Sequence, residues 1–245
     1  MQDNNFQGFV KKGSIKPSME TGLHAIMHGK YVLHFHHLRT LALMCFEEDY
    51  REKLSSIFFG YDIHFAPFIA PGLNITKYIL ENKIENIEIV FLENHGVIVS
   101  SNSLERIEEI LNIFRSELPL KHKRLEITKV NLQTSFFSIN KNIFNRLKML
   151  GSELLYPDQA IFLNLEINIF SDLDDLIKSD SDVALTEDLK LYFKSDLPLT
   201  TIEMLEAHCI LLMHSNDEYI RSISQTEMNE FINLDEEKFR VSIKK

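Results

Sequence analysis

The chain has 245 residues, 44% of them hydrophobic and 25% charged, which suits one large domain or a domain with a substantial appendage. A net charge of −10 at pH 7 disfavours phosphate-coated partners, so we expect neither nucleic acid nor an anionic membrane as a ligand. The N-terminus lacks a signal-peptide pattern, and Cys45 and Cys209 lie far apart in apolar surroundings. We therefore expect a cytoplasmic protein with two buried free thiols.

Residues 1–16 are polar and predict an extended lead-in. Pro17 and Ser18 then predict a helix that runs through Glu20 to about Met27, with Ser18 as its N-cap. Glu20 and His24 are four residues apart and so share a face of this helix. A Glu in the first helical turn also suits the helix dipole, so a structural role for Glu20 is the alternative to a chemical one.

The next element is an apolar strand, residues 31–35, which carries a pair of histidines. Side chains two apart on a strand point to the same face, so His34 and His36 project together. Two imidazoles on one face can bind zinc, which needs one more protein ligand to form a catalytic site with an open position. The alternative is chance, because the chain contains ten histidines, and most histidines are surface or hydrogen-bonded core residues.

The third candidate ligand is His95, in the sequence Asn94-His95-Gly96. Apolar runs on either side predict a strand, a turn and a strand over residues 87–100, with the imidazole presented from the turn. The other elements predicted in this half are a strand at 63–69 and helices at 37–46, 50–59, 74–82 and 104–117. Such alternation predicts a layered α/β domain.

Beyond Pro119 the composition of the sequence changes, and a basic stretch at 121–124 indicates a linker or exposed turn. We predict strands at 125–130 and 160–163, and helices near 141–150, 200–214 and 225–232. His208 and His214 lie on an apolar helix, which is typical of core or surface histidines rather than of metal ligands. We divide the chain into a metal-binding domain, residues 1–120, and a C-terminal α+β extension, residues 121–245.

The order of three motifs resembles the class II aldolase/adducin family, most closely its rhamnulose-phosphate and fuculose-phosphate aldolase branch. The motifs are Pro-Ser-Met-Glu at 17–20, His-Phe-His at 34–36 and Asn-His-Gly at 94–96, and the similarity runs from about Ser14 to about Leu118. The resemblance implies a three-layer α/β/α fold with a largely antiparallel central sheet. It also implies zinc, or another divalent metal, held by His34, His36 and His95.

In the family, the acidic residue at the position of Glu20 moves a proton or touches the metal. The resemblance therefore implies a zinc-dependent aldehyde-lyase that cleaves a carbon–carbon bond of a ketose or sugar-acid phosphate through a metal-stabilised enediolate, with Glu20 as acid/base. We expect Ser18, His24 and Asn94 to contact the substrate or to orient the ligands. Family active sites lie at subunit interfaces, which implies a homo-oligomer, and a tetramer by resemblance.

Two features depart from the family pattern. The phosphate-binding Gly-Asn-x-Ser type loop that precedes this region in family aldolases is not in the sequence as given. No tyrosine lies where a neighbouring subunit often supplies an acid, and Tyr50 and Tyr61 are the nearest substitutes. The alternatives are a non-catalytic, adducin-like interaction protein, a chain completed by a partner, or a family epimerase or decarboxylase. The family's epimerases have Asp where this chain has Glu20, which favours an aldolase.

Overall fold

The structure, a computed structural model, describes residues 18–120, 124–131, 133–150, 153–163, 168–170, 182–215, 218–224 and 226–227. The chain forms two compact units. Unit 1 joins Met1–His36 to Arg51–Glu117, and unit 2 joins His37–Tyr50 to Leu118–Lys245. The functional boundary near residue 120 stays a prediction, and the compact units differ from it by grouping His37–Tyr50 with the C-terminal part.

Unit 1 is built on a four-stranded sheet with the strand order β1-β4-β3-β2. The strands are β1 (Tyr31–Phe35), β2 (Ile63–Ala66), β3 (Ile89–Leu92) and β4 (Gly96–Ser101). Strand β4 pairs antiparallel with both β1 and β3, and β2 runs parallel to β3. All four residues of β3 are buried, which explains its unbroken Ile-Val-Phe-Leu sequence, because a strand covered on both faces needs apolar side chains on both.

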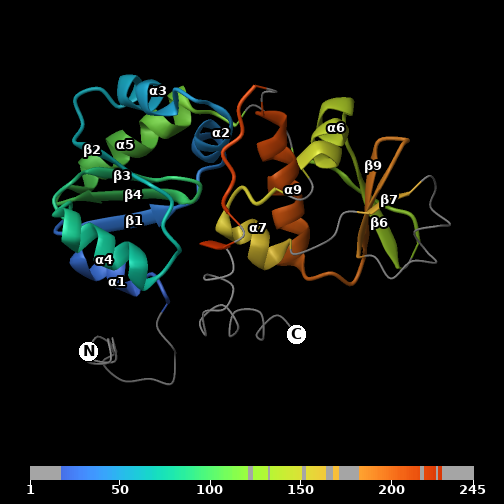
Figure 1. The fold of residues 1–245 in the computed structure, drawn as a ribbon, viewed down its shortest axis with the longest axis horizontal. Helices are drawn as coiled ribbons and strands as arrows, with labels where there is room; N and C mark the ends of the chain where they lie inside the picture. Colours follow the sequence, from blue (N-terminus) through green and yellow to red (C-terminus); the bar gives the residue numbers. More distant parts are fainter. Residues whose placement is uncertain are drawn as a thin grey trace. The chain divides into compact units, whose positions relative to one another are not determined.

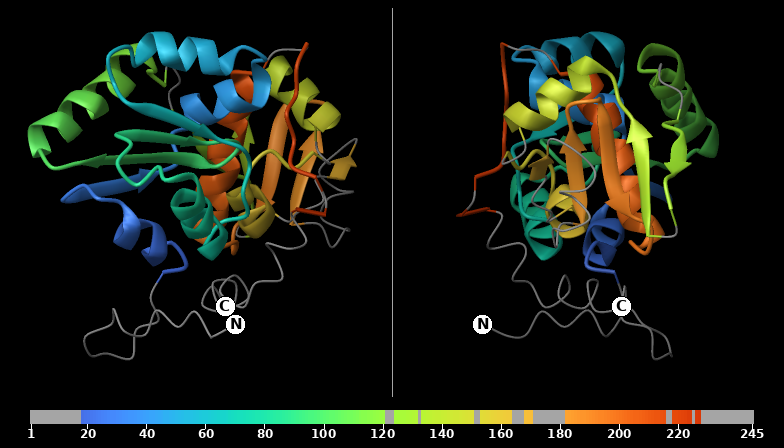
Figure 2. Two further views of the ribbon diagram at one scale, coloured as in Figure 1. Left: turned by 60° about the vertical axis from the view of Figure 1, so that its left-hand side comes forward. Right: turned by 90° about the vertical axis from the view of Figure 1, so that its right-hand side faces the viewer.

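Helices cover both faces of this sheet. They are α1 (Thr21–Ile26), α3 (Tyr50–Ile57), α4 (Leu73–Asn82) and α5 (Leu104–Glu117). Helices α1 and α4 lie on one face, and α3 and α5 lie on the other (Figures 1 and 2). The predicted α/β class, with three α/β/α layers and a largely antiparallel central sheet, is confirmed for unit 1.

Each face of the sheet has its own core. Under α1 and α4, Leu23, Ile75 and Ile79 pack with Val90 and Ile98 of the central strands. On the other face the core is aromatic: the ring of Phe58 lies 4.7 Å from that of Phe114 and 5.6 Å from that of Phe91. Neighbours in β3 point to opposite faces, so Val90 joins the first core and Phe91 the second.

Helix α5 has the bounds that the sequence predicts, and its start explains why. The Ser103 hydroxyl accepts a hydrogen bond from the backbone N–H of Arg106 at 3.2 Å, which is an N-cap bond. Helix α4 ends at Lys83, whose φ of 56° is the left-handed conformation that commonly stops a helix. These local signals set the start of α5 and the end of α4.

Unit 2 contains a five-stranded sheet with the strand order β5-β6-β9-β8-β7. The strands are β5 (Ile127–Lys129), β6 (Thr134–Ser138), β7 (Asn168–Phe170), β8 (Val183–Thr186) and β9 (Lys190–Lys194). Phe137, Leu185, Leu191 and Phe193 are buried on one face of this sheet. Strand β7 runs parallel to β8, and the other pairs are antiparallel.

The helices of unit 2 gather around α9 (Leu199–Met213), which contacts α2 (Leu38–Phe46), α6 (Lys141–Leu150) and α7 (Pro157–Phe162). The buried residues of α9 recur at helical spacing, from Thr201 and Leu205 to Leu212, and form one broad face. They include His208 and Cys209. Both cysteines are free and buried, as predicted.

Three predictions about elements need correction. Residues 160–163 were expected as a strand, but 160–162 belong to helix α7, which starts with Pro157 at a position where proline is tolerated, and Leu163 is its C-cap. Ser18 is not the N-cap of α1; Glu20 occupies that position. Strands β6 to β9 were not predicted. The helix expected at 225–232 lies largely outside the described residues.

Within the described residues, no helix has both the length and the apolar character that crossing a membrane requires.

Candidate metal centre

Strand β1 supplies the first imidazole. His34 pairs with Ile98 of β4, and its Nδ1 lies 3.0 Å from the carbonyl oxygen of Val97. A carbonyl only accepts, so Nδ1 carries the proton and donates it. The lone pair of the neutral ring is then on Nε2, the atom that faces the other histidines. This hydrogen bond fixes both the tautomer and the orientation of a ligand-competent ring.

His36 follows the end of β1 and projects beside His34, as the strand period predicts. The two Nε2 atoms are 3.3 Å apart, and the ring centroids are 5.1 Å apart in an edge-to-face arrangement. Two imidazoles directing the same nitrogen at one point is the geometry expected of a shared ion.

His95 comes from the turn between β3 and β4. Its backbone N–H donates to the carbonyl of Leu92 at 3.0 Å and closes the turn, while Asn94 adopts φ of 55°. The His95 ring is 2% exposed, and its centroid lies 4.7 Å from that of His36 and 5.1 Å from that of His34. The sequence therefore correctly predicted that the three rings come together.

Gly96 makes room for the pair on β1. A Cβ at this position would lie 2.7 Å from Cδ2 of His36, 2.9 Å from the carbonyl oxygen of Phe35 and 3.1 Å from Cε1 of His34. The first two distances are shorter than van der Waals contact allows. A side chain at residue 96 is thus incompatible with the observed positions of His36 and the Phe35 carbonyl, and it would crowd His34. The sequence analysis assigned no such role to Gly96.

The fourth group is the carboxylate of Glu20, directly before α1. Its Oε1 lies 3.2 Å from Nε2 of His34 and 3.5 Å from Nε2 of His95. One ligand atom from each of Glu20, His34, His36 and His95 lies within 4.8 Å of all the others, so the cluster could hold a metal ion. Three imidazole nitrogens and one carboxylate oxygen form a donor set that suits zinc, so the residues present fit the metal that the sequence predicts.

The pKa values of Glu20 and His95 favour the protonation states that bind a metal ion. Burial alone would raise the pKa of Glu20, but the adjacent imidazoles of His34 and His95 outweigh this effect and hold that pKa far below its usual range. Burial lowers the pKa of His95 to about 4. At neutral pH the carboxylate is therefore ionised and His95 is neutral, the forms that bind a cation.

The predicted substrate contacts occupy different environments. The exposed Ser18 accepts a hydrogen bond from the backbone N–H of Glu20 at 3.3 Å. Asn94 is buried in the turn beside His95, whereas His24 is exposed on α1. Ser18 and Asn94 thus adjoin cluster residues along the chain, and no contact joins His24 to the cluster among the described residues. Their roles toward a substrate stay predictions.

The two tyrosines considered as a second acid are engaged elsewhere. Tyr50 is 2% exposed, and the guanidinium of Arg221 lies 4.7 Å from the centre of its ring, within unit 2. Tyr61 stacks against Arg106, with 4.0 Å between the guanidinium and the ring centre. Neither ring contacts the histidine cluster among the contacts of the described residues, so the structure does not support either tyrosine as the second acid.

Part of the chain matches a family of known proteins. Residues 2–111 match the class II aldolase and adducin N-terminal domain. "Uncharacterized oxidoreductase YuxG" of Bacillus subtilis (strain 168) is 29% identical over 92 residues, which are 37% of this chain and 13% of that protein. The solved N-terminal class II aldolase domain of a conserved protein from Thermoplasma acidophilum is 23% identical, with a TM-score of 0.31. That match covers 39% of this chain and 48% of the other, so the chain spans only part of either relative.

Proposed function

We propose that this chain, whose residues 2–111 belong to the class II aldolase and adducin family, is a zinc-dependent lyase. The observation that carries the proposal is the convergence of Glu20, His34, His36 and His95 within 4.8 Å. Placing three imidazoles and a carboxylate side by side, with His95 buried and Glu20 and His34 half-buried, costs free energy unless the groups bind a common partner, which supports a chemical role. The family includes enzymes and non-enzymes, and the intact cluster favours the enzymes.

The three histidines would hold the metal, each through Nε2. The Val97 carbonyl keeps the His34 ring oriented, and Gly96 leaves room for His34 and His36 to approach each other. Bound zinc would act as a Lewis acid toward a substrate carbonyl and stabilise the negative charge that develops as a carbon–carbon bond breaks. The protein's own part is to hold the three nitrogens in place and to exclude water from His95.

Glu20 would move the proton. Its Oε1 lies beside two candidate ligands, so a substrate held at the same centre would meet this carboxylate. Being ionised at neutral pH, Glu20 starts as a base and can return the proton afterwards. We assign it the acid/base role, with contact to the metal as the second possibility at the same position.

The substrate class follows from the family, and we propose a ketose or sugar-acid phosphate. The exposed Ser18, two residues before Glu20, is the candidate contact for an anionic group. We also propose a homo-oligomer, because family active sites lie at subunit interfaces and a neighbouring subunit would supply the second acid. A decarboxylase or epimerase would use the same centre on a related substrate.

The test is the substitution Glu20→Gln, assayed for aldehyde release from ketose 1-phosphates. Gln keeps the size of the side chain but cannot carry a proton, so we expect turnover to fall by about 100-fold or more while zinc content is retained. Glu81→Gln, an exposed carboxylate on α4, is the matched control and should keep full activity. Full activity of Glu20→Gln would refute the role given to Glu20. Bound zinc without cleavage of any substrate by the wild type would favour the interaction protein.

A further inference from the structure

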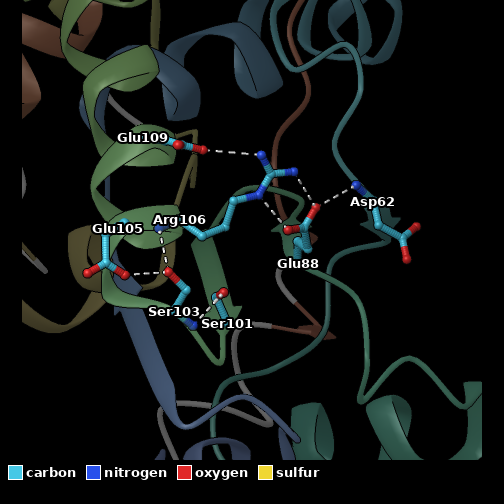
Figure 3. A network of polar contacts seen from close by, with 7 residues as sticks. All are labelled: Asp62, Glu88, Ser101, Ser103, Glu105, Arg106 and Glu109. Carbon is cyan, nitrogen blue, oxygen red and sulfur yellow. Dashed lines mark hydrogen bonds and ion pairs between the residues drawn. The ribbon is translucent and has the colours of Figure 1, made fainter.

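Besides the candidate metal centre, unit 1 contains a second site, a polar cavity with a volume of about 340 Å³. It is lined by residues from the loop after α1, the start of β3, the end of β4 and the first turn of α5, among them His28, Asn86, Glu88, Ser100 and Asn102. Figure 3 shows the network of polar contacts that forms one wall of it. The volume lies within the range of small-molecule sites.

This cavity is separate from the metal centre. Strand β1 pairs with β4 from Tyr31 opposite Ser101 to Phe35 opposite Val97. The histidines lie at the Phe35 end, and the cavity lies at the Tyr31 end. Four residues of extended chain separate the two ends by about 13 Å, so one small ligand cannot occupy both sites.

The wall of the cavity is rigid. Arg106 donates to the two carboxylate oxygens of Glu88, from Nε at 2.8 Å and from Nη2 at 3.1 Å. The backbone N–H of Asp62 donates to the same carboxylate at 3.2 Å. Tyr61 covers one face of the guanidinium, and Ser103 caps the helix that carries Arg106. A bidentate pair held from several sides gives a fixed arrangement of polar atoms.

Several lining groups keep unused hydrogen-bonding capacity within the described part of the chain. The amide oxygens of Asn86 and Asn102 accept from His28 Nδ1 and from the Lys30 backbone N–H, at 2.9 Å and 3.0 Å, but their amide NH₂ groups make no hydrogen bond. Ser100 and Ser101 accept from backbone N–H groups, and their own hydroxyl protons are not used. His28 donates through Nδ1, which leaves its Nε2 as an acceptor.

The charge of the cavity decides the kind of ligand. Among the lining residues, the charges of the Glu88 carboxylate and the Arg106 guanidinium neutralise each other. Arg106 also pairs with Glu109, which lies outside the lining, at 3.3 Å, so the cavity offers no free positive charge to an anion. An anion would approach Glu88, and a cation would have to displace Arg106 from it. Neutral groups that both donate and accept match the mixture of amide, hydroxyl and imidazole groups. Alcohol groups have that property, since each donates one hydrogen bond and accepts up to two.

We propose that this cavity binds a neutral polyhydroxy compound, such as an unphosphorylated monosaccharide, independently of the metal centre. Asn86 and Asn102 donate to its oxygens through their amide groups, and Ser100 and Ser101 through their hydroxyls. His28 Nε2 accepts from one of its hydroxyl groups. The site neither requires nor assists the lyase chemistry, and it stands if the proposed function fails.

The test is saturation-transfer difference NMR and calorimetric titration of the full chain with D-ribose and D-glucose, and with inorganic phosphate as the anionic comparison. The key variants are Asn102→Asp and Asn86→Asp, which keep the oxygen that accepts from Lys30 or His28 and replace the donating NH₂ by oxygen. Each should weaken binding of the sugar by about tenfold or more. Asn112→Asp, on α5 but outside the lining, adds the same charge and keeps the oxygen that accepts from Arg115 at 2.8 Å. It should bind as the wild type does.

A variant with both His34→Ala and His36→Ala separates this proposal from the metal centre and should bind the sugar unchanged. Loss of sugar binding in that variant would move the ligand to the metal centre and overturn the proposal. The same conclusion follows if neither sugar binds the wild type, or if Asn102→Asp and Asn86→Asp bind it normally. Phosphate binding that depends on Asn102 would mean an anion site and would also overturn the proposal.

Discussion

Gly96 sets how closely the two histidines of β1 can approach the turn that carries His95. The missing side chain is the reason, since a Cβ would overlap His36 and the Phe35 carbonyl. Residue 96 must therefore lack a side chain if the three histidines are to come together. Glycine is needed here because there is no room for a side chain. A special backbone conformation is not the reason, since Gly96 is not among the residues with positive φ.

The substitution Gly96→Ala tests this packing. Alanine forces His34 and His36 apart, so we expect zinc affinity to fall by about 100-fold, the upper range for changes around metal ligands. Zinc titration by calorimetry measures the change. Val99→Ala, on the same strand, is the control: it removes buried apolar volume but touches no candidate ligand, so it should lower the melting temperature and keep zinc affinity. Normal zinc binding by Gly96→Ala would contradict the packing argument.

His208 is a buried histidine outside the centre, and it makes stability depend on pH. The Tyr156 hydroxyl lies 3.2 Å from its Nδ1, and burial lowers the pKa of His208 to about 4 from 6.5. In the unfolded chain His208 therefore takes up a proton near pH 6.5, whereas in the folded chain it takes up that proton only near pH 4. Stability falls as the pH drops from 6.5 towards 4, by on the order of 3 kcal/mol for this residue.

We expect His208→Phe to reduce this dependence. The measurement is the free energy of unfolding by urea at pH 7 and at pH 5, for the wild type and the variant. His37 and His95 also have a pKa lowered to about 4 by burial, so part of the slope remains in the variant. Between pH 7 and pH 5 the wild type should lose more unfolding free energy than the variant. An equal loss in the two proteins would show that His208 does not titrate as described.

At the scale of elements, helix α5 is attached to the sheet by an aromatic cluster. Phe114 is 2% exposed, and its ring lies 4.7 Å from that of Phe58 and 5.2 Å from that of Phe35. Phe35 directly precedes His36, so the cluster also supports the strand end that presents the histidines. The core on this face thus serves both stability and the position of the centre.

Phe114→Ala should cost about 3–5 kcal/mol of unfolding free energy, because it leaves a cavity among rings that cannot close it. Leu104→Ala on the same helix is the control, since Leu104 is 48% exposed and should change stability by about 0.5 kcal/mol or less. Urea denaturation measures both. Similar costs for the two substitutions would mean that the aromatic cluster does not anchor α5.

The sequence predicts unit 1 well because its signals are local. The two-residue period of β1 places His34 and His36 on one face, and the Ser103 cap and apolar spacing give the bounds of α5. The sequence could not predict the contact between Glu20 and the histidines by period alone, because it joins separate elements. That contact was expected only because the order of the three motifs resembles a family in which these residues share one site. The space above Gly96 and the Val97 carbonyl bond depend on the pairing of β1 with β4, which has no local signal.

Unit 2 was harder to predict for physical reasons. The run at 160–163 is short and apolar, a pattern that a strand and a buried helix share. The signals for a helix start are Pro157 and Asp158, directly before this run, and the sequence analysis did not use them. Strand β8 is fully buried and β6 largely so, which removes the alternation that normally marks a strand. These elements are defined by their neighbours more than by their own sequences.

At the scale of the whole molecule, the candidate centre belongs to one compact unit. Glu20, His34, His36 and His95 all lie in unit 1, as does the second polar cavity. Unit 2 contributes its own sheet and the helices around α9. The chemistry proposed for this chain is thus assigned to residues that the family match covers, and the role of unit 2 is open to experiment.

The most direct test of the metal centre is the zinc content of the full chain, purified without a chelator or an affinity metal and measured by inductively coupled plasma mass spectrometry. We expect about one zinc, or another divalent ion, per chain in the wild type, and none when His34 and His36 are both replaced by alanine. His24→Ala, which alters an exposed histidine of the same unit, is the control for histidine number and should keep the metal. A wild-type chain without metal, and without uptake of added zinc, would contradict a metal centre formed by this chain alone.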